Sequence, residues 1–181
     1  EKSVWPVAGL SGIGAGVRVW AANDNYYENE GTIIINGGNI HARGQQGSSA
    51  IGGSYQDRNV SSDGDTPGNL RQGGSITING GTVKASTEGD GFGIGGAGVH
   101  HTAEMHITIN DGNIETTANR NNAAIGDKSK QKSSVTITDG VIHAVGKDSA
   151  AGIGSTGDIR ITCGEISAFA EGGGAAIGSI G

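Results

Sequence analysis

The aromatic residues of this sequence are few and unevenly placed. The chain has 181 residues, with two Trp, three Tyr and two Phe, and most of these rings fall in two polar stretches near its start. Trp and Tyr rings stack on the apolar faces of sugar rings, while carboxylate, guanidinium and imidazole groups can bond sugar hydroxyls. The sequence therefore predicts a carbohydrate-binding site made of Trp20, Tyr26, Tyr27, Tyr55, Asp57, Arg58 and His100.

Two alternatives to this site stay open. The aromatic rings could instead pack the polar stretches onto the body of the domain. A competing binding site is a row of residues that recur at one place in the repeat described below, namely His41, Lys84, Glu115 and His143. The choice between the aromatic stretches and this row depends on how the chain folds.

Metal binding is weakly supported by the sequence. Asp63, Asp65 and Asn69 offer oxygen ligands of the kind calcium takes, as do Asn23, Asp24 and Asn25. The same residue types are common in turns without any metal. We therefore expect no cofactor, and calcium stays open as the one candidate.

A catalytic arrangement is not apparent in the sequence. Glu115 and Glu165 are the only carboxylates expected on strands, and they lie two repeats apart. Glycosidases hold their two carboxylates about 5–9.5 Å apart. Cys163 is the single cysteine, so it cannot form an internal disulfide, and we expect it to be a buried structural thiol. The domain is therefore expected not to be an enzyme.

These candidate residues must be positioned by a repeat of about 24 residues. With the first apolar residue of each copy as position 0, further apolar residues recur at +2, +7 and +18, and glycine recurs at +5 and +19. The apolar alternation around 0 and +7 is typical of short strands with one buried face. Complete copies begin at Ile33, Ile76, Ile107, Val135 and Ile159, and a partial copy ends at Ile13-Gly14.

A repeat this short buries its apolar face only by stacking on its neighbours. We therefore predict an all-β fold, a right-handed parallel β-helix of about five to six coils with three short strands per coil. The Gly at +5 is expected where the backbone needs a conformation other residues avoid. The Asn residues at +3 are expected to form a hydrogen-bonded ladder. Sequence between copies is longest before Ile33 and Ile76 and shrinks towards Ile159, so the insertions should gather at one corner, where repeat proteins often bind.

Composition limits the partners. The net charge is −6, which argues against nucleic acid and anionic membranes. Glycine contributes 36 residues, but its regular spacing with Ile excludes disorder and collagen. We expect a single domain over residues 1–181, a monomer, excised from a larger secreted enzyme.

The copies ITINGGTVKAS…GFGIGG and ITINDGNIETT…AAIGD resemble the Gly-rich β-helix repeats of surface and secreted proteins of gut anaerobes. Among these, the chain looks like the β-helix carbohydrate-binding modules attached to xylanases and other enzymes that degrade plant polysaccharides. The resemblance implies a non-catalytic extracellular module that binds a plant cell-wall polysaccharide, xylan first, and targets an attached glycoside hydrolase. The alternatives are a fragment of a β-helix polysaccharide lyase or hydrolase, and a bacterial surface adhesin repeat.

Overall fold

The computed structural model describes residues 12–14, 31–45, 47–53, 73–96, 104–128 and 132–180. Within these segments all strand pairing is parallel, and no helix is long and apolar enough to cross a membrane. The strands are β1 (Ile13–Gly14), β2 (Gly31–Ile35), β3 (Asn39–Gly44), β4 (Ile51–Gly52), β5 (Gly74–Ile78), β6 (Thr82–Thr87), β7 (Ile94–Gly95), β8 (Met105–Ile109), β9 (Asn113–Ala118), β10 (Ala123–Asp127), β11 (Ser134–Ile137), β12 (Val141–Asp148), β13 (Ala151–Ser155), β14 (Ile159–Ile161), β15 (Glu165–Gly172) and β16 (Ile177–Ser179).

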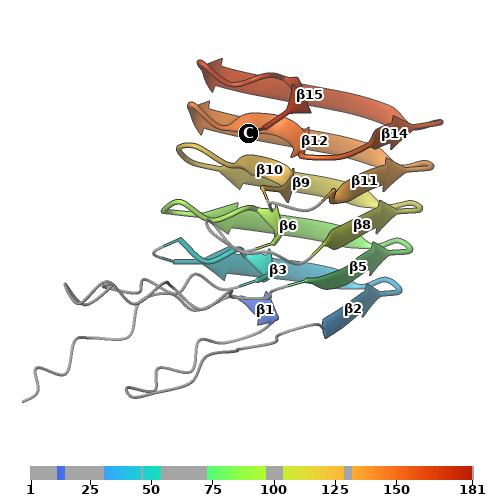
Figure 1. Cartoon of the computed structure of the whole chain (residues 1–181). Helices are drawn as coiled ribbons and strands as arrows, with labels where there is room; N and C mark the ends of the chain where they lie inside the picture. The colour runs from blue at the N-terminus through green and yellow to red at the C-terminus, as the bar shows by residue number, and fades with distance from the viewer. Residues whose placement is uncertain are drawn as a thin grey trace, which may run out of the picture.

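The strands form three sheets that run the length of the molecule (Figure 1). One sheet has the order β1-β4-β7-β10-β13-β16, the second β14-β11-β8-β5-β2 and the third β15-β12-β9-β6-β3. Each complete repeat gives one strand to each sheet, so successive repeats stack as coils. The predicted all-β parallel β-helix with three strands per coil is thus confirmed, while its right-handed sense stays a prediction.

The apolar repeat positions form ladders inside the coils. Ile78, Ile109 and Ile137 pair in register across neighbouring strands, and all three are fully buried. Full burial of one such side chain contributes about 1.5–3 kcal/mol of hydrophobic free energy. The ladders at positions 0, +7 and +18 have the same arrangement and join one continuous core. The repeated Ile positions therefore supply the interior that no single coil could make.

The Asn residues at +3 form the expected ladder at the turn after the first strand of each coil. The Asn79 side-chain amide donates to Asn36 Oδ1 at 2.7 Å, and Asn110 donates to Asn79 Oδ1 at 2.7 Å. Thr138 continues the line, since its hydroxyl donates to Asn110 Oδ1 at 3.2 Å. The ladder pairs polar groups along the stack and has a structural role.

The Gly at +5 follows the same turn and has a positive φ in every complete coil. Its φ is +95° at Gly38, +96° at Gly81, +121° at Gly112, +106° at Gly140 and +101° at Gly164. From the second of these coils on, the position also has no room for a side chain: a Cβ on Gly140 would lie 2.8 Å from the Gly112 carbonyl oxygen. That oxygen accepts a hydrogen bond from the Val141 amide at 2.8 Å. Conformation and close coil packing together require glycine here.

Insertions between repeats occur at one junction, as the spacing predicts. They connect β1 to β2, β4 to β5, β7 to β8 and β10 to β11, each a step from the first sheet to the second. The last junction, from β13 to β14, is only a bare turn over residues 156–158.

Candidate functional site

The residues of the predicted aromatic site lie outside the described segments. This holds for all seven members, Trp20, Tyr26, Tyr27, Tyr55, Asp57, Arg58 and His100. It also holds for the calcium candidates Asn23, Asp24, Asn25, Asp63, Asp65 and Asn69. The site at the insertions therefore stays a prediction. Among the described residues, no group of three or more His, Cys, Asp and Glu side chains is placed to hold a metal ion.

The competing row is described in full and forms a line across the third sheet. Lys84 pairs in register with His41 on one side and with Glu115 on the other, and His143 pairs with Glu115. Ser167 on β15 extends the line by one strand. These side chains alternate with buried ones such as Val83, Ala85 and Ile114, so they point outward. We call His41, Lys84, Glu115, His143 and Ser167 the outer polar row.

An ion pair holds the middle of the outer polar row. Lys84 Nζ lies 2.8 Å from Glu115 Oε2, and both side chains are about half exposed. The hydrogen bond and the charge of Lys84 lower the pKa of Glu115 below its ordinary value of 4.5 against an opposing effect of burial, and His143 and His41 lower it further. Glu115 is therefore an ionised hydrogen-bond acceptor near neutral pH and is not suited to act as a general acid there.

A shallow hollow of about 340 Å³ lies over the first three strands of this sheet. Beside the outer polar row it contains Arg43, Ser86 and Thr117, which occupy the next outward position along β3, β6 and β9. Arg43 forms an exposed ion pair with Glu88. The hollow is thus lined by hydrogen-bonding groups whose lysine and arginine charges are each matched by a neighbouring carboxylate.

Phe169 stands beside the other end of the outer polar row. Its side chain is 51% exposed, and its ring centroid lies 5.5 Å from that of His143, with the two rings tilted by 59°. Phe169 occupies an outward position on β15, whereas Phe92 is fully buried. The carbohydrate site predicted from the sequence does not include Phe169, although the repeat places Phe169 opposite Val145, two residues along β12 from His143.

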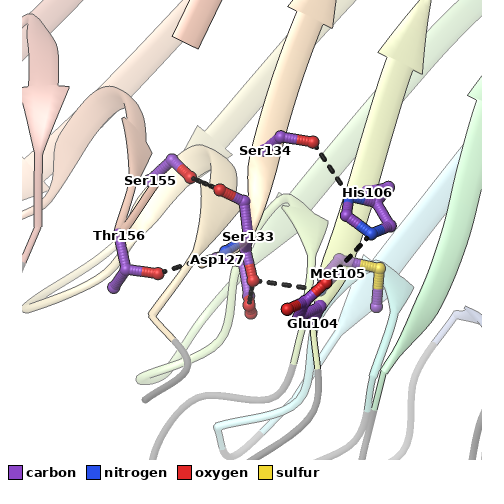
Figure 2. A network of polar contacts seen from close by, with 8 residues as sticks. All are labelled: Glu104, Met105, His106, Asp127, Ser133, Ser134, Ser155 and Thr156. Carbon is purple, nitrogen blue, oxygen red and sulfur yellow. Dashed lines mark hydrogen bonds and ion pairs between the residues drawn. The ribbon is translucent and has the colours of Figure 1, made fainter. Parts of the chain in front are cut away.

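A second polar cluster lies on the second sheet, around β8 and β11 (Figure 2). His106 Nδ1 lies 2.9 Å from Ser134 Oγ, and His106 Nε2 lies 3.5 Å from a Glu104 carboxylate oxygen. A Ser, a His and a carboxylate in contact are also the components of a nucleophilic hydrolase. Here the His–Glu distance is beyond a good hydrogen bond. These side chains do not line the hollow over the third sheet.

The buried residues of the same cluster join neighbouring coils by hydrogen bonds. The Ser133 hydroxyl donates to an Asp127 carboxylate oxygen and accepts a bond from the Met105 amide at 2.9 Å (Figure 2). Ser155 donates to the Ser133 carbonyl at 2.8 Å. Because Asp127, Ser133 and Ser155 are almost fully buried, these contacts secure the corner between β10 and β11 and are out of reach of a ligand.

Two sequence expectations about single residues are wrong. Strand carboxylates are not confined to Glu115 and Glu165, because β10 contains Asp127, β12 ends at Asp148 and β15 contains Glu171. These strands extend further than the alternating apolar positions indicated. Cys163 is exposed and is not a buried thiol, since it lies in the outward turn between β14 and β15.

Part of the chain matches a known family of repeats. Three stretches, residues 33–55, 76–98 and 135–158, match the family model described as a beta helix repeat. Each stretch begins at position 0 of a copy, at Ile33, Ile76 and Val135, so the match and the coil register agree. The copies at Ile107 and Ile159 keep the register outside the matched stretches. No curated protein and no solved structure matches the chain.

Proposed function

We propose that this β-helix domain is a non-catalytic carbohydrate-binding module that binds a plant cell-wall polysaccharide, with xylan as the first candidate. The observation that carries the proposal is the outer polar row, a line of hydrogen-bonding side chains from His41 to Ser167 along the stack of coils. In this role the module acts outside the cell and brings an attached glycoside hydrolase to its substrate.

The spacing of the outer polar row suits an extended glycan. Neighbouring strands in a sheet lie about 4.8 Å apart. This is close to the advance per sugar of an extended β-linked chain, so a glycan lying along the stack presents hydroxyls to successive members of the row. Aligned donors and acceptors on a pre-ordered surface limit the conformational cost of binding.

The charge pattern favours a neutral glycan over a polyuronate. Lys84 is matched by Glu115 and Arg43 by Glu88, so the lysine and arginine charges beside the row are internally compensated. The net charge of −6 for the whole chain adds repulsion towards a polyanion. Xylan backbones carry hydroxyls without charge, and this supports xylan as the first candidate.

Titration calorimetry with xylo-oligosaccharides tests the proposal. Lys84→Ala and Glu115→Ala should each weaken binding on the order of 10-fold or more, because each removes a charged hydrogen-bonding group from the row. Arg160→Ala removes an exposed cation on β14, in the second sheet, and should leave affinity unchanged. Tyr55→Ala and Trp20→Ala examine the insertion site in the same assay. If only these two weaken binding, the site belongs to the insertions and not to the outer polar row.

A hydrolysis assay separates the module from an enzyme. The purified domain should release neither reducing ends nor unsaturated uronic products from xylan or pectin, nor acyl groups from esterified xylan. The contact of Ser134 with His106 makes Ser134→Ala the informative variant. Hydrolysis by the unmodified domain that is lost in Ser134→Ala would show a serine hydrolase and overturn the non-catalytic proposal.

A further inference from the structure

The exposed ring of Phe169 has no structural counterpart in the other coils. The outward positions paired with it along the sheet carry Val145, Thr117, Ser86 and Arg43. A polar or small outward side chain is therefore compatible with the sheet at this position. Of the Phe, Tyr and Trp side chains in the described segments, Phe92 is fully buried and Phe169 is open to solvent. The packing of the coils therefore does not explain the aromatic ring at position 169.

Neighbouring side chains hold the Phe169 ring in place. The His143 ring contacts it at a centroid distance of 5.5 Å. Val145 lies opposite Phe169 in the strand register and supplies an apolar neighbour on the same outward row. Half of the side chain remains exposed. An outward-facing ring held by a neighbouring side chain can stack on a ligand without a large loss of side-chain entropy.

His143 is the member of the outer polar row that contacts the Phe169 ring. It contacts Phe169 and pairs in register with Glu115, which in turn holds Lys84 at 2.8 Å. From β15 to β6 is three strand spacings, which corresponds to about 14 Å along the stack. One surface thus has an apolar ring at one end and a compensated pair of charged groups further along. This combination matches a ligand with apolar ring faces and hydroxylated edges.

We propose that Phe169, supported by His143, is the stacking subsite for a sugar ring, and that the glycan runs from it along the outer polar row towards Lys84. This inference rests on the proposed carbohydrate function and specifies its geometry. The C–H face of a pyranose packs on the Phe169 ring, while hydroxyls further along the chain bond Glu115 and Lys84. Because the row runs in one line across several strands, the site takes an extended stretch of several sugars.

The decisive experiment measures xylohexaose affinity by titration calorimetry for Phe169→Ala, Phe169→Leu and the unmodified domain. By analogy with stacked bases, loss of the ring should weaken binding on the order of 5- to 150-fold. Phe169→Leu keeps apolar area without the flat ring and should give an intermediate loss. Ile34→Ala removes a side chain that is 59% exposed on the second sheet and serves as the matched control, with unchanged affinity. Equal unfolding midpoints of Phe169→Ala and Ile34→Ala exclude a folding defect.

Ligand length tests the direction of the glycan. A xylobiose molecule is too short to reach from Phe169 to Lys84, so no single bound xylobiose should depend on both residues. Xylohexaose should lose affinity on substitution of either one. If Lys84→Ala weakens xylohexaose binding and Phe169→Ala does not, the subsite is wrong and the carbohydrate function stands. If the unmodified domain binds no glycan at all, both proposals are wrong.

Discussion

The Lys84–Glu115 ion pair is the central contact of the outer polar row. Both side chains are about half exposed, so water screens their attraction and the pair contributes at most about 1 kcal/mol to stability. Its more important effect is positional, because each partner restrains the other at the surface where a hydroxylated ligand would lie. A weak ion pair of this kind can exchange one of its contacts for a ligand hydroxyl at little cost.

The lowered pKa of Glu115 makes the contribution of this pair depend on pH. The folded state favours the ionised carboxylate, so the stabilisation is fully present above the ordinary pKa of 4.5 and is lost as pH falls through the lowered value. Glu115→Gln should therefore lower the thermal midpoint at neutral pH by no more than about 2–4 °C, the shift expected for about 1 kcal/mol in a domain of this size. In acid well below pH 4.5, Glu115→Gln and the unmodified domain should have the same thermal midpoint.

A control for this prediction is Glu171→Gln, which neutralises an exposed glutamate on β15 away from Lys84. Its midpoint relative to the unmodified domain should not follow the same pH dependence. A difference between Glu115→Gln and the unmodified domain that grew as pH fell would contradict the assigned ion pair.

At the level of the element, the turn between the first and second strand of each coil fixes the register of the stack. The Asn ladder pairs side chains along the stack, while the Gly carbonyls accept backbone amides of the next coil, as Gly112 does from Val141 at 2.8 Å. This turn determines where β12 begins relative to β9. It therefore places His143 opposite Glu115 and keeps the outer polar row in line.

Gly140→Ala should disturb this turn and destabilise the domain. The alanine would have to adopt a φ near +106° with its Cβ 2.8 Å from the Gly112 carbonyl oxygen. Substitutions at such positions destabilise by more than about 1 kcal/mol. Gly173→Ala is the control, because a Cβ there would meet nothing closer than Ser149 Oγ at 3.9 Å. Equal urea midpoints for the two variants would mean that the turn tolerates a side chain and that the Gly column has another cause.

At the scale of the whole molecule, burial is not uniform along the stack. Ile137 in β11 is fully buried, whereas Ile161, its register partner in β14, is 37% exposed. In the first sheet Ile153 is fully buried and its partner Ile177 is 45% exposed. Equivalent positions of one ladder thus differ in how much apolar side chain they remove from water.

Equal substitutions along one ladder should therefore have unequal effects. Ile137→Ala removes a buried side chain between two neighbours and should cost about 2–5 kcal/mol. Ile161→Ala, in the same ladder, should cost clearly less, because its side chain already contacts water. Urea unfolding of the two variants measures both costs. A greater loss for Ile161→Ala would contradict the costs inferred from the burial of these two side chains.

Much of the fold could be predicted from residue spacing. A parallel strand pair places residue i of one coil beside its equivalent in the next, so the recurrence of a β-branched apolar residue at Ile76, Ile107 and Val135 already defined the register. The Gly column at +5 predicted an unusual backbone conformation, and its φ values confirm it. The outward direction of His41, Lys84, Glu115 and His143 followed from the same period-two alternation.

The contacts between outward side chains were decided by the tertiary structure. Glu115 and His143 are far apart in sequence, and only the stacking of β9 on β12 makes them neighbours. The ladder alignment alone could not say that Lys84 bonds Glu115, or that the His143 ring meets Phe169, since rotamers decide which exposed side chains touch. Likewise the exposure of Cys163 depended on the path of its turn. The register of the strands follows from the spacing of residues in the sequence, whereas contacts between surface side chains depend on which distant residues the stacked coils bring together.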